Sequence, residues 1–173
     1  MSKSRISMPD GFTPTGHVLR DSPIAHIPTA MEALVTLYPA VWFDGPLSPA
    51  ELEMVRLRNA HAVGCVYCKA ARYDIAREDG LDEDKVALIS RATPDSDLSA
   101  REQLILAYTD AYLNDPESLA EDVKQALLAE LGTEGVAHLA IALGIFNGTS
   151  RGAVAFGGMP EEDLPVIPMA VPV

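Results

Sequence analysis

Residues 47–72 read LSPAELEMVRLRNAHAVGCVYCKAAR, and this stretch carries the clearest helix signals of the chain together with both of its cysteines. Ser48, followed by a proline and then by Glu51, forms a capping box with proline at the first helical position. The pattern predicts a helix over about 50–63 that is closed by a glycine. A second helix is then expected to begin at the first cysteine and to cover about 65–79.

The rest of the core has the same helical character. A second capping box is formed by Ser99 and Glu102, and strand-type alternation of apolar and polar residues is absent from the sequence. The predicted helices cover about 29–41, 50–63, 65–79, 81–92, 100–113, 116–131 and 133–155. We therefore predict a single domain over 1–173 with an all-α fold, a bundle of about seven helices.

Prolines cluster at both ends of the chain, outside a helical core of about 29–157. Proline lacks the N–H group that a helix or a central strand needs, so both segments are predicted to be extended arms. Two interpretations remain open, since the arms can be frayed termini or can wrap around a neighbouring subunit. Residues 136–146 are apolar on nearly every side, which indicates burial all round and favours a homo-oligomer.

The composition and charge exclude several function classes. Apolar residues make up 48% of the chain, and the net charge of −12 leaves no basic surplus for nucleic acid or for an anionic membrane surface. The longest apolar run, over 136–146, is interrupted by His138 and is too short to span a bilayer. No signal peptide is recognisable, so we expect a soluble cytoplasmic protein.

Side chains on the helix before the cysteines suggest proton-transfer chemistry. Glu53, Leu57 and His61 follow one another at four-residue intervals, so they share a face of the helix that leads toward Cys65. The alternative is that Glu53 and His61 are ordinary solvated helix residues. Arg56 lies at the edge of the apolar face, and we expect it to form a buried or interfacial ion pair.

Both cysteines fall in the first turn of the next predicted helix. Unpaired N–H groups and the helix dipole at this end favour the thiolate form of a cysteine. Arg72 comes one turn after Cys68, so its guanidinium is expected beside that sulfur, with Lys69 adding positive charge. The alternative is that Arg72 pairs with a carboxylate such as Glu53 or Asp79.

The cysteine pair has two other interpretations. A structural zinc site usually needs four closely spaced ligands, but this chain has two cysteines and four scattered histidines, so we expect no metal and no cofactor. The second alternative is a pair of inert core cysteines. His138, within an apolar helix, is predicted to be a satisfied core histidine rather than a ligand.

Two features together resemble a known family. Glu53 is followed after eleven residues by the CVYC motif at 65–68, and HLAIALGIFNGTSR follows downstream at 138–151. This arrangement is similar to the core motif of the alkylhydroperoxidase D family, within the carboxymuconolactone decarboxylase superfamily. The resemblance covers about 29–157 and implies an all-helical subunit that assembles as a trimer or a hexamer.

The resemblance also implies roles for three residues. In the family the cysteine pair reduces a hydroperoxide and cycles through a disulfide. By position in the motif, Cys68 is the attacking thiolate and Cys65 is the resolving thiol. Glu53 is the group that orients water or accepts a proton.

The chain departs from the family pattern at two positions where histidine is usual. Arg72 stands four residues after the second cysteine, and Tyr67 stands between the two cysteines. Arginine can stabilise a thiolate but stays charged, so it cannot relay protons. His61 is therefore predicted to be the relay, with Tyr67 as a weaker candidate.

Three functions are compatible with these residues. The first is a thiol-dependent hydroperoxide reductase or a related disulfide oxidoreductase, reduced in turn by a dithiol protein. The second, implied by the decarboxylase branch, is a cofactor-free lyase or isomerase whose small lactone or carboxylate substrate is held by Arg56, Arg72 or Arg151. The third is a non-catalytic oligomer that senses oxidation through the same pair. The presence of both cysteines favours the first.

Overall fold

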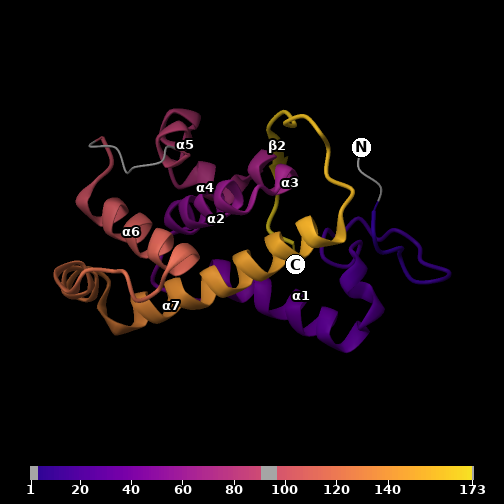
Figure 1. Cartoon of the computed structure of the whole chain (residues 1–173), viewed down its shortest axis with the longest axis horizontal. Coiled ribbons are helices and arrows are strands. Elements are labelled where there is room, and N and C mark those ends of the chain that lie inside the picture. The colour runs from indigo at the N-terminus through magenta and orange to yellow at the C-terminus, as the bar shows by residue number, and fades with distance from the viewer. Residues whose placement is uncertain (1–3, 91–96, 173) are drawn as a thin grey trace.

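The computed structural model describes residues 4–90 and 97–172. Helices dominate it, and the long helix α7 runs along the molecule with α1, α2 and α6 packed against it (Figure 1). The helices are the short 3-10 helix η1 (Pro23–His26), α1 (Pro28–Phe43), α2 (Pro49–Val63), α3 (Val66–Ala70), α4 (Asp74–Glu78), α5 (Glu83–Ile89), α6 (Ala100–Asn114) and α7 (Glu121–Phe156). The all-α fold class is confirmed, with seven α-helices in the described part of the chain.

The helix starts that were marked by capping boxes are confirmed. At the start of α2, the Ser48 hydroxyl accepts a hydrogen bond from the Glu51 N–H, and the Glu51 carboxylate accepts one from the Ser48 N–H at 2.9 Å. The same reciprocal pair opens α6. Gly64 closes α2 in the left-handed conformation, with φ of 73°. The fourth helix, predicted over 81–92, is the shorter α5, which ends at Ile89 with Ser90 as its C-cap, and residue 92 lies outside the described residues.

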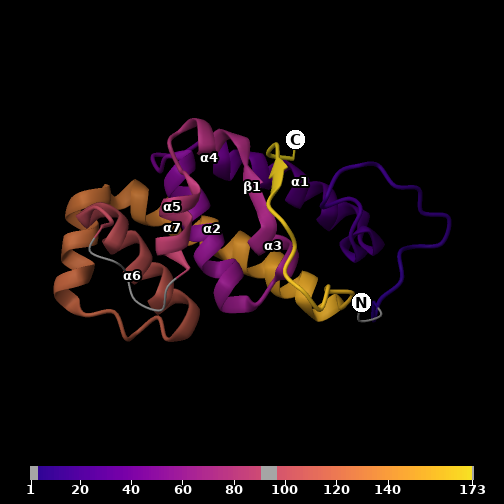
Figure 2. The ribbon, with the colours of Figure 1, turned by 90° about the horizontal axis from the view of Figure 1, so that it is seen from above.

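The single helix predicted over 65–79 is wrong, because an extended segment divides it. Strand β1 (Ala71–Tyr73) separates α3 from α4 and pairs in parallel with β2 (Ile167–Met169) from the C-terminal arm. Figure 2 shows the two strands side by side next to α3. The expected absence of strands is corrected to this one short two-stranded sheet within the described residues.

The break after α3 has a physical cause in helix α2. In a continuous helix the carbonyl groups of Cys68 and Ala71 would accept hydrogen bonds from N–H groups four residues later. Both carbonyls are instead bonded by Arg56, which donates from Nη1 to the Cys68 oxygen and from Nη2 to the Ala71 oxygen, each at 2.7 Å. A side chain from a neighbouring helix thus replaces the helical bonds of this segment.

The two helices predicted over 116–131 and 133–155 form one element with a sharp break. At Gly132 the backbone has φ of 66° and ψ of 174°, which is not helical, so α7 consists of two parts. The break falls where the two predictions met. The first part begins at Glu121, later than the predicted start at Pro116.

Helix α7 is long and apolar enough to cross a membrane by its length and composition alone. In the structure it supplies Leu139, Leu143 and Phe146 to the core, each at most 1% exposed. The break at Gly132 also divides its length. One face of α7 therefore packs into the core.

The centre of the core is aromatic. The ring of Trp42 lies 4.7 Å from that of Tyr73 and 5.6 Å from that of Phe146, and Tyr38 contacts both Tyr73 and Phe146. These rings come from α1, β1 and α7, so they join the segment that follows the cysteines to the long helix. Close aromatic packing of this kind holds the neighbouring cavity wall in one shape.

His138 is a satisfied core histidine, as predicted. Its Nε2 donates to the Val41 carbonyl at 2.8 Å, and its Nδ1 accepts from the Leu47 N–H at 3.3 Å, so the ring is the neutral Nε2–H tautomer. Gly45 lies directly against the ring, where a Cβ atom would overlap it. The histidine therefore fixes the α1–α2 connection to α7.

Both arms pack on the core of their own chain rather than fraying. The Arg5 N–H bonds to the Phe156 carbonyl at 2.7 Å, and Leu19 is buried to 7% exposure. On the other side, β2 pairs with β1, and Val171 is buried to 6% exposure. Ser4 of the N-terminal arm pairs with Gly157 just after α7, and the C-terminal arm runs past α3 (Figure 2).

Candidate active site

The two cysteines lie at the junction of α2 and α3. Cys65 caps α3, because its sulfur accepts a hydrogen bond from the Cys68 N–H at 3.2 Å. The two sulfurs are joined in a disulfide with an S–S distance of 2.10 Å. Cys65 is fully buried, whereas Cys68 is partly exposed. The two sulfurs are therefore not equivalent, and Cys68 is the one that an outside molecule reaches first.

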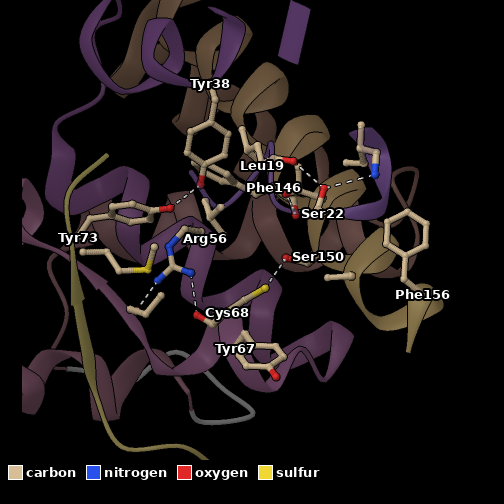
Figure 3. A pocket seen from close by; sticks show the side chains of 16 residues that line it. Leu19, Ser22, Tyr38, Arg56, Tyr67, Cys68, Tyr73, Phe146, Ser150 and Phe156 are labelled. Carbon is tan, nitrogen blue, oxygen red and sulfur yellow. Dashed lines mark hydrogen bonds between the residues drawn. The ribbon is translucent and has the colours of Figure 1, made fainter. Parts of the chain in front are cut away.

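A cavity of about 270 Å³ lies beside Cys68. Its walls come from α1, α2, α3, β1 and the end of α7, and both arms close over it. Figure 3 shows the side chains around it, which are mostly apolar or aromatic. They include Leu19, Tyr38, Tyr67, Tyr73, Phe146, Phe156 and Met169. A cavity of this composition suits a small apolar molecule.

At the cavity wall, Arg56 forms the buried ion pair expected of it, and its partner is Glu53, which was considered only as a partner for Arg72. Arg56 Nε donates to Glu53 Oε2 at 2.6 Å and Nη2 donates to Oε1 at 2.7 Å, while the Tyr73 N–H also donates to Oε1 at 3.3 Å. Glu53 is 1% exposed and Arg56 is 4% exposed. Since Arg56 also holds the Cys68 carbonyl, the pair fixes the backbone of the thiol segment from below.

Arg56 keeps its charge in spite of its burial. Burial alone opposes the charge on Arg56, but the adjoining Glu53 carboxylate more than offsets this and raises the pKa of the guanidinium. The Glu53 oxygens are occupied by Arg56 and by the Tyr73 N–H, and Glu53 does not line the cavity. Its role as a water-orienting group or proton acceptor stays a prediction, and its contacts are those of an anchor.

The expectation that the Arg72 guanidinium lies beside the Cys68 sulfur is wrong. Arg72 Nε donates to Glu83 Oε1 at 2.9 Å, and Nη1 donates to the Lys69 carbonyl at 2.6 Å. The alternative prediction, that Arg72 pairs with a carboxylate, is confirmed. The carboxylate is that of Glu83, not that of Glu53 or Asp79. The physical reason is β1, because an extended residue 72 does not follow Cys68 on one helix face.

The structure places His61 away from the cavity that Cys68 lines. His61 is exposed and lines a separate depression with Lys69, Arg72 and Asp163. Partial burial lowers the pKa of its imidazole, and the positive charges of Lys69 and Arg72 lower it further. The stripe of Glu53, Leu57 and His61 therefore leads from a buried ion pair to the surface.

A relay role for His61 stays a prediction that one substitution tests. If His61 delivers protons to the thiol chemistry, His61→Ala should slow hydroperoxide turnover by about 10²-fold, the usual range for a general acid. An unchanged rate would exclude the role, and the position of the ring favours that result. Turnover measured from pH 5 to 8 in both proteins separates these outcomes, since a histidine relay would also remove one titration from the profile.

The sequence analysis missed two tyrosines that line the cavity. The hydroxyl groups of Tyr38 and Tyr73 are hydrogen-bonded to each other at 3.0 Å, and the Arg56 guanidinium lies 5.1 Å from the centre of the Tyr73 ring. Burial raises the pKa of both phenols, so both stay protonated at neutral pH. Tyr67, the weaker relay candidate, also lines the cavity and is 43% exposed.

A polar group on the other wall of the cavity was also missed. The Ser150 hydroxyl lies 3.5 Å from the Cys68 sulfur (Figure 3). The side chain of Asn59 donates to that hydroxyl at 3.1 Å. Asn59 was visible in the sequence as the one polar residue on the apolar face of α2. A buried amide in such a place must have partners, and that signal points to the site.

Within the described residues, no group of three or more histidine, cysteine or acidic side chains is arranged to hold a metal ion. The acidic residue of the motif, Glu53, is bonded to Arg56 instead. The reactive groups that the site brings together are the two cysteines and the hydroxyl groups of Tyr38, Tyr73 and Ser150.

The comparison with protein families agrees with this geometry. The sequence model of the carboxymuconolactone decarboxylase family matches residues 28–111, which include α1, α2, both cysteines and most of α6. Over this stretch, which holds the cysteine motif, the chain is similar to that family. Two uncharacterized proteins of Mycobacterium tuberculosis, from strains CDC 1551 and H37Rv, are each 30% identical to it over 119 residues. That match covers 69% of this chain and 42% of each relative, so the chain spans less than half their length.

Two solved structures have a similar fold. One is a protein of unknown function from Agrobacterium tumefaciens, described as a candidate antioxidant-defence protein of the AhpD type, with a TM-score of 0.67 and 26% identity. The match covers 83% of this chain and 99% of that one. The other is an uncharacterized peroxidase-related protein from Silicibacter sp. TM1040, with a TM-score of 0.67, 19% identity and coverage of 83% and 74%. The helical architecture is therefore that of the AhpD-like proteins.

Proposed function

We propose that this protein is a thiol-dependent reductase of small organic hydroperoxides. The observation that carries the proposal is the position of Cys68, which is partly exposed at an apolar cavity and lies within disulfide distance of the buried Cys65. The match to the carboxymuconolactone decarboxylase family over 28–111 and the likeness to a candidate AhpD-type protein support the same proposal.

In the proposed reaction, the Cys68 thiolate attacks the terminal oxygen of the hydroperoxide. The S–O bond forms as the O–O bond breaks, and the alkoxide takes a proton to leave as the alcohol. The Cys65 thiol then loses its proton, and its sulfur attacks the sulfenic acid on Cys68. The S–S bond forms as water leaves. A dithiol protein returns two electrons and two protons, which restores both thiols.

The unequal exposure of the cysteines supports this division of roles. The attacking thiolate must meet the hydroperoxide, and Cys68 borders the cavity. The resolving thiol needs to reach only the oxidised partner, and Cys65 has 0% exposure and lies against it. Burial of the resolving thiol also keeps it from reacting with the hydroperoxide directly.

The lyase alternative finds less support in the contacts of the arginines. Arg56 is bonded to Glu53 and to two backbone carbonyls, and Arg72 is bonded to Glu83. Arg151 is exposed and donates from Nε to Asn147 Oδ1 at 3.1 Å. A carboxylate substrate would have to displace a buried ion pair to gain a bidentate clamp from Arg56.

The apolar cavity gives the substrate preference a direct test. Ala153 lies on α7 and lines the cavity. In Ala153→Phe the larger ring should fill much of this space, and disulfide formation with cumene hydroperoxide should slow by about tenfold or more, since contacts with the apolar body of the substrate are lost. Reaction with hydrogen peroxide should change much less. Stopped-flow fluorescence of the reduced proteins measures both rates, and equal slowing of the two peroxides would contradict a cavity that binds the substrate.

We further propose that the protein works as a homo-oligomer in the cytoplasm. On the outer face of α7, Ile141 is 53% exposed and is flanked along one stripe by the exposed small residues Ala137, Gly144 and Gly148. Small residues let another helix approach closely, and an exposed isoleucine among them is favourable to bury. A reducing compartment would return the thiols to their active state.

Ile141→Glu tests the assembly, because a carboxylate in an apolar contact would be buried without a partner. Light scattering at micromolar concentration should give an oligomer for the wild-type protein and a smaller species for the variant. A wild-type monomer, or an assembly that Ile141→Glu leaves intact, would contradict an interface on this face. Circular dichroism of the variant controls for loss of the fold.

A further inference from the structure

A chain of hydrogen bonds between side chains ends at the sulfur of Cys68. Asn147 Nδ2 donates to Asn59 Oδ1 at 2.8 Å, Asn59 Nδ2 donates to Ser150 Oγ at 3.1 Å, and Ser150 Oγ lies 3.5 Å from Cys68 Sγ. Asn59 is completely buried and Ser150 is 3% exposed. These hydrogen bonds join α2 to α7 behind the Cys68 sulfur. Their last member, Ser150, lies in the wall of the cavity (Figure 3).

The direction of these bonds is determined by their chemistry. Asn147 donates to the oxygen of Asn59, so the amide nitrogen of Asn59 must face Ser150 and the Phe146 carbonyl, to which it donates at 3.1 Å. Ser150 therefore receives a hydrogen bond on its oxygen. Its single hydrogen remains free to be donated, and the nearby acceptor is the Cys68 sulfur.

The hydroxyl hydrogen of Ser150 is not donated to a carbonyl group of its own helix. A serine inside a helix commonly donates to the carbonyl four residues earlier, which for Ser150 is that of Phe146. That carbonyl already accepts from Asn59 Nδ2 and from Thr149 Oγ1, each at 3.1 Å. The Ser150 hydroxyl points to sulfur instead.

We propose that Ser150 is a catalytic residue of the thiol pair, donating a hydrogen bond to the Cys68 thiolate, and that Asn59 and Asn147 are its positioning residues. The assignment rests on the proposed thiol chemistry. Arg72 was expected to stabilise the thiolate, but its guanidinium is bonded to Glu83. The proposal gives this role to Ser150. In the disulfide the sulfur is a weak acceptor, but on reduction it becomes an anion facing a hydroxyl that is already oriented.

The test measures the acidity of the Cys68 thiol without any peroxide. Cys65→Ser leaves one thiol in the protein and keeps a residue that caps helices well at the start of α3. In this background the rate of alkylation by iodoacetamide, followed from pH 4 to 10, reports the pKa of Cys68. Ser150→Ala should raise that pKa by about one to two pH units, the effect of losing a hydrogen bond to a charged group.

Two further variants separate a hydrogen bond to sulfur from the general effect of removing a buried polar group. Thr109→Val removes a buried hydroxyl on α6, which donates to the Ile105 carbonyl, and should leave the pKa of Cys68 at the parent value. Asn147→Ala should raise it by less than Ser150→Ala, because Ser150 keeps its hydroxyl and its bond from Asn59, and only the partner that orients Asn59 is lost. Equal pKa values for Ser150→Ala and Thr109→Val would overturn the assignment.

Failure of the assignment and failure of the proposed function give different results. If wild-type protein reduces cumene hydroperoxide but Ser150→Ala does not change the pKa of Cys68, the assignment to Ser150 is wrong and the function stands. If Ser150→Ala raises the pKa but wild-type protein leaves the hydroperoxide intact, the hydrogen bond is real and the proposed reaction is wrong.

Discussion

Cys68→Ser is expected to abolish the reaction with organic hydroperoxides, whereas Cys65→Ser should still carry out the first oxidation and stop there. The reason is that Cys68 borders the cavity and Cys65 is buried behind it. In Cys65→Ser the sulfenic acid on Cys68 has no thiol to attack it, so it should accumulate and be trapped by dimedone. Mass spectrometry of both variants after one equivalent of cumene hydroperoxide measures this.

The two variants also control for each other. Each removes one thiol and the disulfide, so a loss of stability would affect them alike. An adduct on Cys65 in Cys68→Ser would reverse the roles. If both variants consumed hydroperoxide as fast as the wild-type protein, the pair would be structural.

Glu53→Ala is expected to cause the largest loss of stability of any single change discussed above. It leaves Arg56, which is 4% exposed, as a buried charge without its carboxylate partner. Removing one member of a buried pair costs about 3–5 kcal/mol, because the remaining charge stays desolvated. Equilibrium unfolding in urea should show this as a lower midpoint with an unchanged slope.

A matched control exists on the surface. Arg20 and Glu32 form the same kind of bidentate pair, but their side chains are 33% and 54% exposed. Glu32→Ala should therefore change the urea midpoint little, since solvent takes over the charge of the arginine. If Glu32→Ala and Glu53→Ala unfolded at the same urea concentration, the anchoring role of the buried pair would be refuted.

The helical fold could be predicted where its signals are local. Ser48 with Glu51 and Ser99 with Glu102 mark helix starts that depend on residues three positions apart, and both starts are confirmed. The segment after Cys68 could not be predicted in this way. The conformation of this segment depends on hydrogen bonds from Arg56 and on the pairing of β1 with β2. Strand β2 comes nearly a hundred residues later in the sequence.

The same distinction explains the candidate site. The spacing of Cys65 and Cys68 places both at a helix start, and the structure confirms this. The partners of Arg72 and Cys68 depend on tertiary packing, since Glu83 comes from α5 and Ser150 from α7. Helix periodicity describes the faces of one helix and carries no information about which other helix lies against them.

The most direct test of the central claim counts thiols and products together. Fully reduced wild-type protein is mixed with one equivalent of cumene hydroperoxide, and free thiols and the alcohol are measured before and after a dithiol reductant is added. The proposed function predicts that two thiols disappear for each hydroperoxide converted to alcohol, that the reductant restores both, and that the cycle repeats with more hydroperoxide. Thiols that stay at two per chain while the hydroperoxide persists would contradict the account, as would a disulfide that forms once and does not turn over.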